Sequence, residues 1–229
     1  MLKDDLEIIN VDSYINPEYC FKMVILGDSG VGKTSLVKYE INNSFINNNE
    51  STIFFQHSFK NFSILEKIVR LQIWDICGQG ADQSSMKHFC RSTLLIAVVF
   101  SLESLDSFYN VNKWLNLIKG ANISESPILV LIGNKCDINE QKIIPECLID
   151  DFCRKNGIEK YFEASAKTGQ NVHEIFKKLI KELFIKYAMP IININNENKN
   201  EEKEILPPIK NSLNSRISKC FNFCYCYNQ

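Results

Sequence analysis

The chain has 229 residues, of which 45% are hydrophobic and 23% are charged, and its formal net charge at pH 7 is -1. This composition is typical of a globular protein with one sizeable hydrophobic core. Because the net charge is close to zero, non-specific binding to nucleic acid is not expected.

The start of the chain does not resemble a secretory signal. Asp4, Asp5 and Glu7 stand where such a signal needs an uninterrupted apolar stretch. The nine cysteines are an odd number, and without an export signal they are expected to stay reduced rather than form a disulfide framework. Residues 1–17 are interpreted as an N-terminal extension of a domain that spans residues 18–189.

Short apolar runs alternate with stretches of helical periodicity along this domain. The predicted strands are 20–26, 94–100, 127–133 and 160–165, with a hairpin at 54–64 and 67–75, and the predicted helices are 33–41, 104–120, 145–157 and 171–187. Apolar strands joined by crossover helices indicate a sheet that is covered on both faces. The expected fold class is therefore α/β: a three-layer, doubly wound, mostly parallel sheet of six strands with one antiparallel edge strand.

Residues 190–229 differ in composition from the rest of the chain. They are rich in asparagine and charged residues and include Pro207 and Pro208. Such a segment cannot bury enough apolar surface to offset its ordering entropy, so we expect a flexible hypervariable tail.

The stretch GDSGVGKTS, from Gly27 to Ser35, directly follows the first predicted strand. Its glycines allow successive backbone N–H groups to point at one anion, and the following helix adds a partial positive charge. Lys33 supplies a mobile positive charge for terminal phosphates, and the Thr34 hydroxyl is a hard oxygen ligand for Mg²⁺. This is the P-loop pattern, which indicates a nucleoside triphosphate and leaves ATPases, kinases and GTPases open.

Two further loops indicate which base is bound. NKCD, Asn134 to Asp137, and SAK, Ser165 to Lys167, each end an apolar strand at the same predicted rim as the P-loop. The Asp137 carboxylate can accept two hydrogen bonds from the edge of guanine, whereas adenine would leave it unpaired. The small Ser165 lets the Ala166 N–H reach the guanine carbonyl.

With these motifs, residues 19–186 resemble the Ras superfamily of small GTPases, and within it the Rab branch most closely. The resemblance implies that Phe45 packs against guanine, that Thr52 and Asp75 bind magnesium, that Gly78 binds the terminal phosphate, and that Gln79 orients the attacking water. The predicted nucleotide-binding residues are Gly27, Asp28, Ser29, Gly30, Val31, Gly32, Lys33, Thr34, Ser35, Phe45, Thr52, Asp75, Gly78, Asn134, Lys135, Asp137, Ser165, Ala166 and Lys167; the catalytic ones are Gln79, Lys33 and Thr52; the magnesium ligands are Thr34, Thr52 and Asp75.

The resemblance also implies a biological role. A Rab-like protein binds and hydrolyses GTP and regulates vesicle trafficking by recruiting effector proteins in the GTP state. It cycles between the cytosol and the cytoplasmic face of an intracellular membrane. No arginine finger is visible in the chain, so an activating protein is expected to supply one, and an exchange factor to load GTP.

The chain departs from the Rab pattern around the predicted switch segments. Phe54 and Phe55 replace a glycine and a small aliphatic residue, and strand alternation predicts one exposed and one buried ring. Cys77 replaces an alanine, and Gly80 adds backbone freedom next to Gln79, so slow intrinsic hydrolysis is expected. The alternative is a membrane-tethered scaffold that binds GTP with little or no turnover. An ATP-using P-loop kinase is disfavoured by Asp137 and Ala166.

The last residues, KCFNFCYCYNQ, contain three cysteines. Cys224 and Cys226 resemble the paired cysteines that Rab proteins use for two prenyl chains, and two lipids give stable anchoring where one is marginal. A membrane partner is therefore expected. The histidines lack metal-ligand spacing, and His88 and His173 are expected on helix surfaces.

Overall fold

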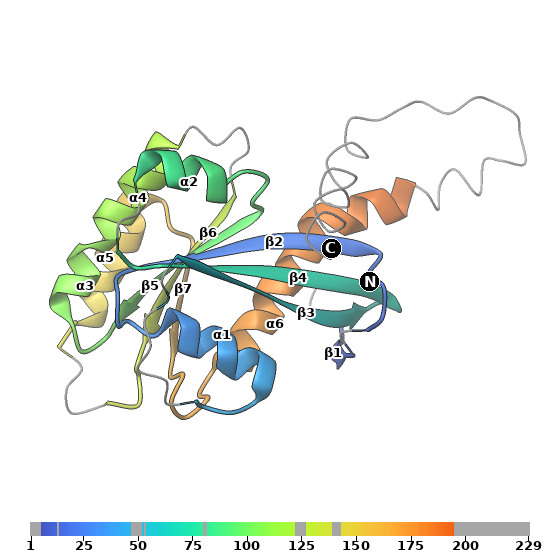
Figure 1. The fold of residues 1–229 in the computed structure, drawn as a ribbon, viewed down its shortest axis with the longest axis horizontal. Helices are drawn as coiled ribbons and strands as arrows, with labels where there is room; N and C mark the ends of the chain where they lie inside the picture. The colour runs from blue at the N-terminus through green and yellow to red at the C-terminus, as the bar shows by residue number, and fades with distance from the viewer. Residues whose placement is uncertain are drawn as a thin grey trace, which may run out of the picture. The chain divides into compact units, whose positions relative to one another are not determined.

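A computed structural model of the protein describes residues 6–12, 14–46, 52, 54–79, 82–121, 127–138 and 143–194. Strands and helices alternate along these residues (Figure 1). In chain order the elements are β1 (Ile8–Val11), β2 (Tyr19–Leu26), α1 (Lys33–Asn42), β3 (Phe55–Ile64), β4 (Lys67–Ile76), α2 (Gln83–Phe89), β5 (Leu95–Ser101), α3 (Leu105–Tyr109), α4 (Val111–Gly120), β6 (Ile128–Asn134), α5 (Glu146–Asn156), β7 (Lys160–Ala164), α6 (Val172–Leu183) and the π-helix η2 (Phe184–Ala188).

The strands form one mostly parallel sheet, as predicted. Their order is β1-β3-β4-β2-β5-β6-β7, and β2, β5, β6 and β7 pair in parallel. Strands β3 and β4 are joined by Leu65 and Glu66, whose φ angles of 51° and 60° suit a tight hairpin turn. The predicted hairpin is therefore present.

Among the residues that the structure describes, the sheet has seven strands rather than the predicted six. The additional strand is β1, which pairs antiparallel with β3 from Ile8 opposite Ile64 to Val11 opposite Asn61. The antiparallel edge is therefore β1, and β3 lies inside it. Strand β1 was not predicted, because its four residues, IINV, carry too little periodicity to be recognised as a strand.

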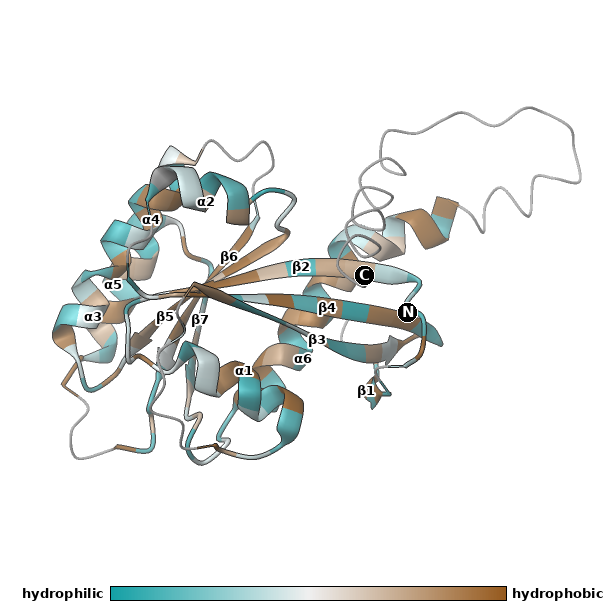
Figure 2. Cartoon of the chain, in the orientation of Figure 1, coloured by the Kyte–Doolittle hydropathy of each residue, from teal (hydrophilic) through white to brown (hydrophobic). Residues whose placement is uncertain are grey.

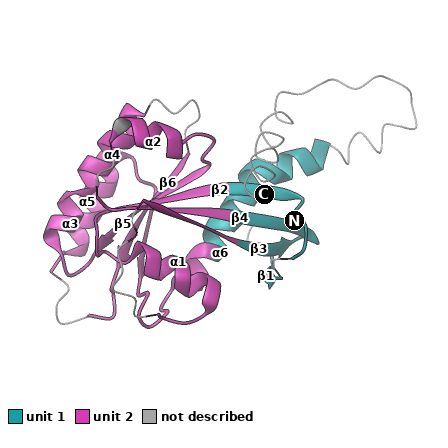
Figure 3. Ribbon diagram, in the orientation of Figure 1, with its two compact units in different colours: residues 1–21, 60–71, 177–229 teal, residues 22–59, 72–176 magenta. Residues whose placement is uncertain are grey.

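The chain divides into two compact units (Figure 3). The first consists of the described parts of residues 1–21, 60–71 and 177–229. Within it the Asn61 amide donates to the carbonyls of Asp12 and Ile15, at 3.0 Å each, and its oxygen accepts from Arg70 Nε at 2.9 Å. These bonds anchor the segment that follows β1.

The second unit consists of the described parts of residues 22–59 and 72–176 and contains β5, β6, β7 and residues 22–26 of β2. All seven residues of β5 are buried. One cluster of buried residues joins β2, β4, β5 and β6 to α2, α3, α4 and α5, and in Figure 2 hydrophobic colouring concentrates in these strands. Val24 and Leu26 of β2 belong to that cluster, so the alternating Met23 and Ile25 point to the opposite face.

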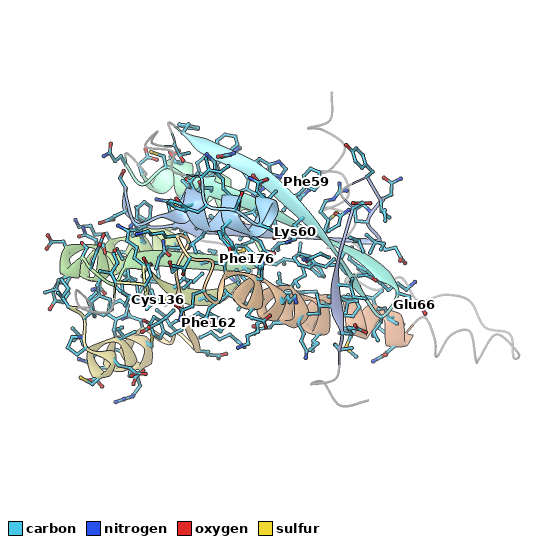
Figure 4. The ribbon with its side chains drawn as sticks, turned by 90° about the horizontal axis from the view of Figure 1, so that it is seen from below. Phe59, Lys60, Glu66, Cys136, Phe162 and Phe176 are labelled. Carbon is cyan, nitrogen blue, oxygen red and sulfur yellow. The ribbon has the colours of Figure 1, made fainter. Side chains whose placement is uncertain are left out.

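Helix α1 and the first residues of α6, up to Phe176, supply the other layer of this unit. Their buried residues lie outside the cluster just described and include Leu36, Val37, Ile175 and Phe176, the last labelled in Figure 4. The predicted three-layer arrangement is thus present. Within the described residues, no helix is both long enough and apolar enough to cross a membrane.

Most predicted helices are present with small changes. Helix α5 begins after Pro145 and ends at Gly157, whose φ of 65° is the left-handed conformation that ends many helices. The predicted helix 104–120 is divided at Asn110 into α3 and α4. Helix α2 was not predicted, because it has only seven residues; it is capped by the Asp82 carboxylate, which accepts from Ser85 N at 2.7 Å.

Candidate nucleotide-binding site

A cavity of about 510 Å³ lies where the P-loop, the NKCD loop and the SAK loop meet in the second unit. These loops follow the carboxyl ends of β2, β6 and β7, the edge at which parallel sheets bind ligands. The predicted binding residues that line the cavity are Ser29, Gly30, Gly32, Lys33, Thr34, Ser35, Phe45, Thr52, Gly78, Asn134, Lys135, Asp137, Ala166 and Lys167. The three motifs, far apart in the sequence, therefore share one site.

The remaining predicted residues do not line the cavity: Gly27, Asp28, Val31, Asp75, Gln79 and Ser165. Asp28 has a different task, because its carboxylate accepts hydrogen bonds from Asn110 Nδ2 at 2.7 Å and from Trp114 Nε1 at 2.9 Å. Its side chain ties the P-loop to α4. The Gln79 side chain is exposed.

The P-loop backbone wraps around the ammonium group of Lys33. Lys33 Nζ donates to the carbonyls of Gly27 and Asp28, at 2.8 Å each. Burial lowers the pKa of Lys33, and the negative charge of Asp75 opposes that effect. Gly32 has φ of 92°, and a Cβ there would lie 2.3 Å from Asn134 Nδ2, so only glycine fits. The loop is preformed around a cation that faces the cavity.

Three oxygen-bearing side chains meet next to Lys33. Thr34 Oγ1 lies 2.8 Å from Thr52 Oγ1, and it donates a short hydrogen bond to Asp75 Oδ2. The other carboxylate oxygen, Asp75 Oδ1, is buried and has no hydrogen-bond partner among the described residues. Burial is also the main cause that raises the pKa of Asp75. Hard oxygens with one unsatisfied acceptor fit Mg²⁺, so Thr34, Thr52 and Asp75 are suited to hold that ion.

Side-chain hydrogen bonds join the loops at the opposite end of the cavity. Asn134 Nδ2 donates to Val31 O at 2.8 Å, and Asn134 Oδ1 accepts from Ala166 N at 3.1 Å. Ser165 Oγ donates to Asp137 Oδ1 at 2.5 Å, which holds the carboxylate in place. Asn134 thereby links the P-loop to both base-reading loops.

Four further residues line the cavity and were missed by sequence analysis: Lys38, Ile46, Glu103 and Ile138. Lys38 lies one helical turn after Thr34, so the spacing could have placed it on the same face of α1. Glu103 forms an ion pair with Lys135, and both side chains are 31% exposed. No motif includes Glu103, because it follows β5 in a segment without any phosphate or base signature.

The two phenylalanines after Thr52 behave as strand alternation predicts. Phe54 is 65% exposed, whereas the Phe55 ring is partly buried and stacks on Trp74 with a centroid distance of 5.2 Å. Both rings also contact Phe89 of α2, at 5.9 Å and 5.5 Å. Trp74 and Phe89 therefore pack against the Phe55 ring as part of the hydrophobic core, whereas the Phe54 ring faces outward.

Some predictions fall on residues that the structure does not describe. Gly80, the tail beyond residue 194 and both proposed lipid-bearing residues, Cys224 and Cys226, are outside the described ranges. His173 was expected on a helix surface. It lies on α6, but its ring is in contact with the buried Glu40, so that expectation was incomplete.

Comparison with known proteins identifies the family to which this fold and cavity belong. Residues 22–185 match the Ras family. The chain is 32% identical over 180 residues to the Ras-related protein Rab-13 of Bos taurus, covering 79% of this chain and 88% of that protein. It is 32% identical over 183 residues to Rab-2B of Dictyostelium discoideum (80% and 90% covered), and 39% over 166 residues to RABG1 of Arabidopsis thaliana (70% and 81%). The chain therefore belongs to the Ras family of small GTPases, as a divergent Rab-like member.

Proposed function

We propose that this protein binds GTP and GDP together with Mg²⁺, hydrolyses GTP and acts as a Rab-type switch in vesicle trafficking. The observation that carries the proposal is one shared cavity, in which a fixed carboxylate, Asp137, and a phosphate loop with Lys33 are both present. The nucleotide-binding domain spans residues 18–189, the extension 1–17 precedes it and the tail 190–229 follows it.

Base selection is assigned to Asp137 and Ala166. The carboxylate is held by Ser165, so it can accept hydrogen bonds from the two adjacent donors of guanine without first changing its rotamer. The backbone N–H of Ala166 already donates to Asn134 Oδ1, and guanine binding requires this bond to be shared or exchanged. Adenine has no such donor pair and would leave the carboxylate desolvated and unpaired.

Hydrolysis is assigned to residues at the phosphate end. Magnesium, when bound, supplies positive charge that neutralises the phosphate oxygens during transfer. Lys33 adds a further positive charge, and the hydroxyls of Thr34 and Thr52, with the Asp75 carboxylate, would hold the ion. Gln79 orients the attacking water. Its side chain is exposed and does not line the cavity, and ordering it against a water costs conformational entropy, which favours slow intrinsic turnover.

The switch acts through Thr52 and Gly78. Both line the cavity, and the N–H of Cys77 donates to Phe54 O at 3.0 Å, so the two segments are connected. Ordering of this region by the terminal phosphate and release after hydrolysis is the expected cycle. The exposed Phe54 ring gives effector proteins an apolar contact that changes position with the nucleotide state.

The trafficking role rests on the Rab-named relatives and on the terminal cysteines. Prenyl chains on Cys224 and Cys226 would hold the protein on the cytoplasmic face of an intracellular membrane. Full-length protein and a variant with Cys224→Ser and Cys226→Ser should be compared in cells. Retention of both on membranes would contradict the lipid assignment, and diffuse localisation of the variant alone would support it.

Hydrolysis is tested by single-turnover phosphate release from GTP-loaded protein. We expect release slower than that of ordinary Rab proteins, abolished in Gln79→Leu and accelerated by an activating protein that supplies an arginine. The exposed Gln79 gives some support to the second candidate function, a scaffold that binds GTP without turnover. No detectable phosphate release from either the wild type or Gln79→Leu would favour that candidate. A wild-type rate equal to that of ordinary Rab proteins would contradict slow turnover.

A further inference from the structure

A carboxylate is buried on the helix that follows the P-loop. Glu40 of α1 is only 1% exposed, and its Oε2 lies 2.6 Å from Nδ1 of His173 on α6. With Glu40 ionised, its carboxylate can only accept, so His173 Nδ1 is the donor in this contact. Glu40 is buried and the His173 side chain is 34% exposed, and a contact that buries a carboxylate adds little net stability relative to apolar side chains of the same size, so stability alone gives no reason for its presence. Such pairs are directional, which makes them suitable for fixing one element against another.

A second contact joins the same two parts of the chain. The rings of Tyr39 and His173 have a centroid distance of 5.6 Å. Gly169, in the loop before α6, has φ of 81°, and a Cβ there would lie 1.9 Å from Tyr39 Oη. The loop backbone therefore rests directly on the Tyr39 side chain.

The two parts of the chain joined in this way hold opposite ends of the cavity. Helix α1 begins with Lys33 and Thr34 at the phosphate end, and the segment that leads into α6 begins with the base-reading Ser165 and Ala166. That segment is internally braced, because Gly169 N donates to Ser165 O at 2.8 Å and Ser165 N donates to Gln170 O at 3.0 Å. A shift of α6 relative to α1 would therefore move the base-reading loop relative to the phosphate loop.

We propose that the Glu40–His173 pair positions the base-reading loop against the phosphate-binding helix, and thereby sets how slowly guanine nucleotide leaves the cavity. Both are positioning residues, since neither lines the cavity. The proposal rests on guanine-nucleotide binding as the function of this site. It adds that retention of the nucleotide depends on a contact near the C-terminal end of α1, outside the cavity.

The test measures release of a fluorescent GDP analogue from the full-length protein in excess Mg²⁺ and unlabelled GDP. His173→Leu leaves Glu40 without this bond and should accelerate release about ten-fold, whereas Glu40→Gln keeps a neutral hydrogen bond and should have a smaller effect. The matched control is Glu174→Gln, which makes the same chemical change at an exposed position next to His173 and should release GDP at the wild-type rate.

A double variant, Glu40→Leu with His173→Leu, separates positioning from stability. It has no unpaired buried charge and should fold, yet it lacks the directional bond, so release should remain accelerated. Hydrogen exchange should increase at 168–171 and remain unchanged in β5, whereas loss of general stability would increase both. Wild-type release from the double variant would overturn the proposal. Failure of the wild-type protein to retain GDP at all would instead contradict the function on which it rests.

Discussion

The phosphate end of the cavity is built mainly from backbone, whereas the base end is built from side chains. At the phosphate end, Gly32 permits a left-handed turn and two loop carbonyls surround the Lys33 ammonium. At the base end, Asn134 and Ser165 hold the loops and the Asp137 carboxylate through side-chain hydrogen bonds. The backbone would contact the phosphates, which every nucleotide carries, whereas the side chains would contact the base, which distinguishes one nucleotide from another. Substitutions at the two ends should therefore change affinity and specificity separately.

The largest effect is expected at Lys33. Replacement by Met removes a buried positive charge that faces the polyphosphate and leaves the carbonyls of Gly27 and Asp28 without that donor. We expect GTP and GDP affinity to fall by about 10² to 10³, with no gain for any other base. Equilibrium binding of a fluorescent nucleotide measures this change. Lys113→Met, on an exposed position of α4, is the control and should bind as wild type does; a Lys33 variant that also binds as wild type does would refute the assignment.

Asp137→Asn tests the base end alone. The side chain that this change introduces has one acceptor, the amide oxygen, and one donor group, the amide NH₂. Ser165 can still donate to the amide oxygen, and the NH₂ group should then repel the exocyclic amine of guanine. GTP affinity should fall about 10- to 100-fold. Xanthosine triphosphate has a carbonyl in place of that amine, so it should bind the variant more tightly than it binds the wild type. Competition binding with both nucleotides provides the measurement. An equal loss of affinity for GTP and xanthosine triphosphate would show that the carboxylate does not contact the base.

Asn134→Ala tests the connection between the two ends. This change leaves the Val31 carbonyl and the Ala166 N–H without a side-chain partner. Each unsatisfied buried group lowers the free energy of unfolding by about 1 to 3 kcal/mol. We expect a lower melting temperature and about ten-fold faster GDP release. Asn156→Ala removes a comparable amide, bonded to Phe152 O at 3.0 Å at the end of α5, and should leave release unchanged. Unaltered release in the Asn134 variant would mean that the two ends act independently.

The smallest effect, and of opposite sign, is expected at Glu103. Its carboxylate lines a cavity that accepts a polyanion and is paired with Lys135, and both side chains are 31% exposed. Such pairs contribute about 0.2 to 1 kcal/mol, so Glu103→Gln should cost little stability. GTP affinity should rise by up to about five-fold at low salt and less at high salt, because a repulsive charge is removed. Weaker binding at every salt concentration would show that Glu103 positions Lys135 instead.

Sequence reasoning succeeded where one short motif determines the local structure. The P-loop, NKCD and SAK stretches each follow a predicted strand, and parallel strands bring such loops to one edge. Pro145 and Gly157 likewise marked the ends of α5, because each favours the backbone conformation found there. The exposed Phe54 and the partly buried Phe55 followed from the alternation expected where the chain enters β3.

Reasoning from local pattern failed where the determinant is tertiary. Strand β1 is held by pairing with β3 rather than by its own four residues. The Asp28 side chain bonds Asn110 and Trp114, which are more than 80 positions further along the chain. The Glu40–His173 contact joins residues 133 positions apart, and nothing in the neighbourhood of either residue indicates the other. Such pairs become visible only when the helices are packed.

The central claim is that Asp137 makes this cavity specific for guanine. The most direct test is equilibrium displacement of a fluorescent GTP analogue from the full-length wild-type protein by GTP, GDP and ATP in excess Mg²⁺. We predict that GTP and GDP displace the analogue, whereas ATP in about 1,000-fold excess does not. Displacement by ATP at the same concentration as GTP, or no binding of the GTP analogue at all, would contradict the account.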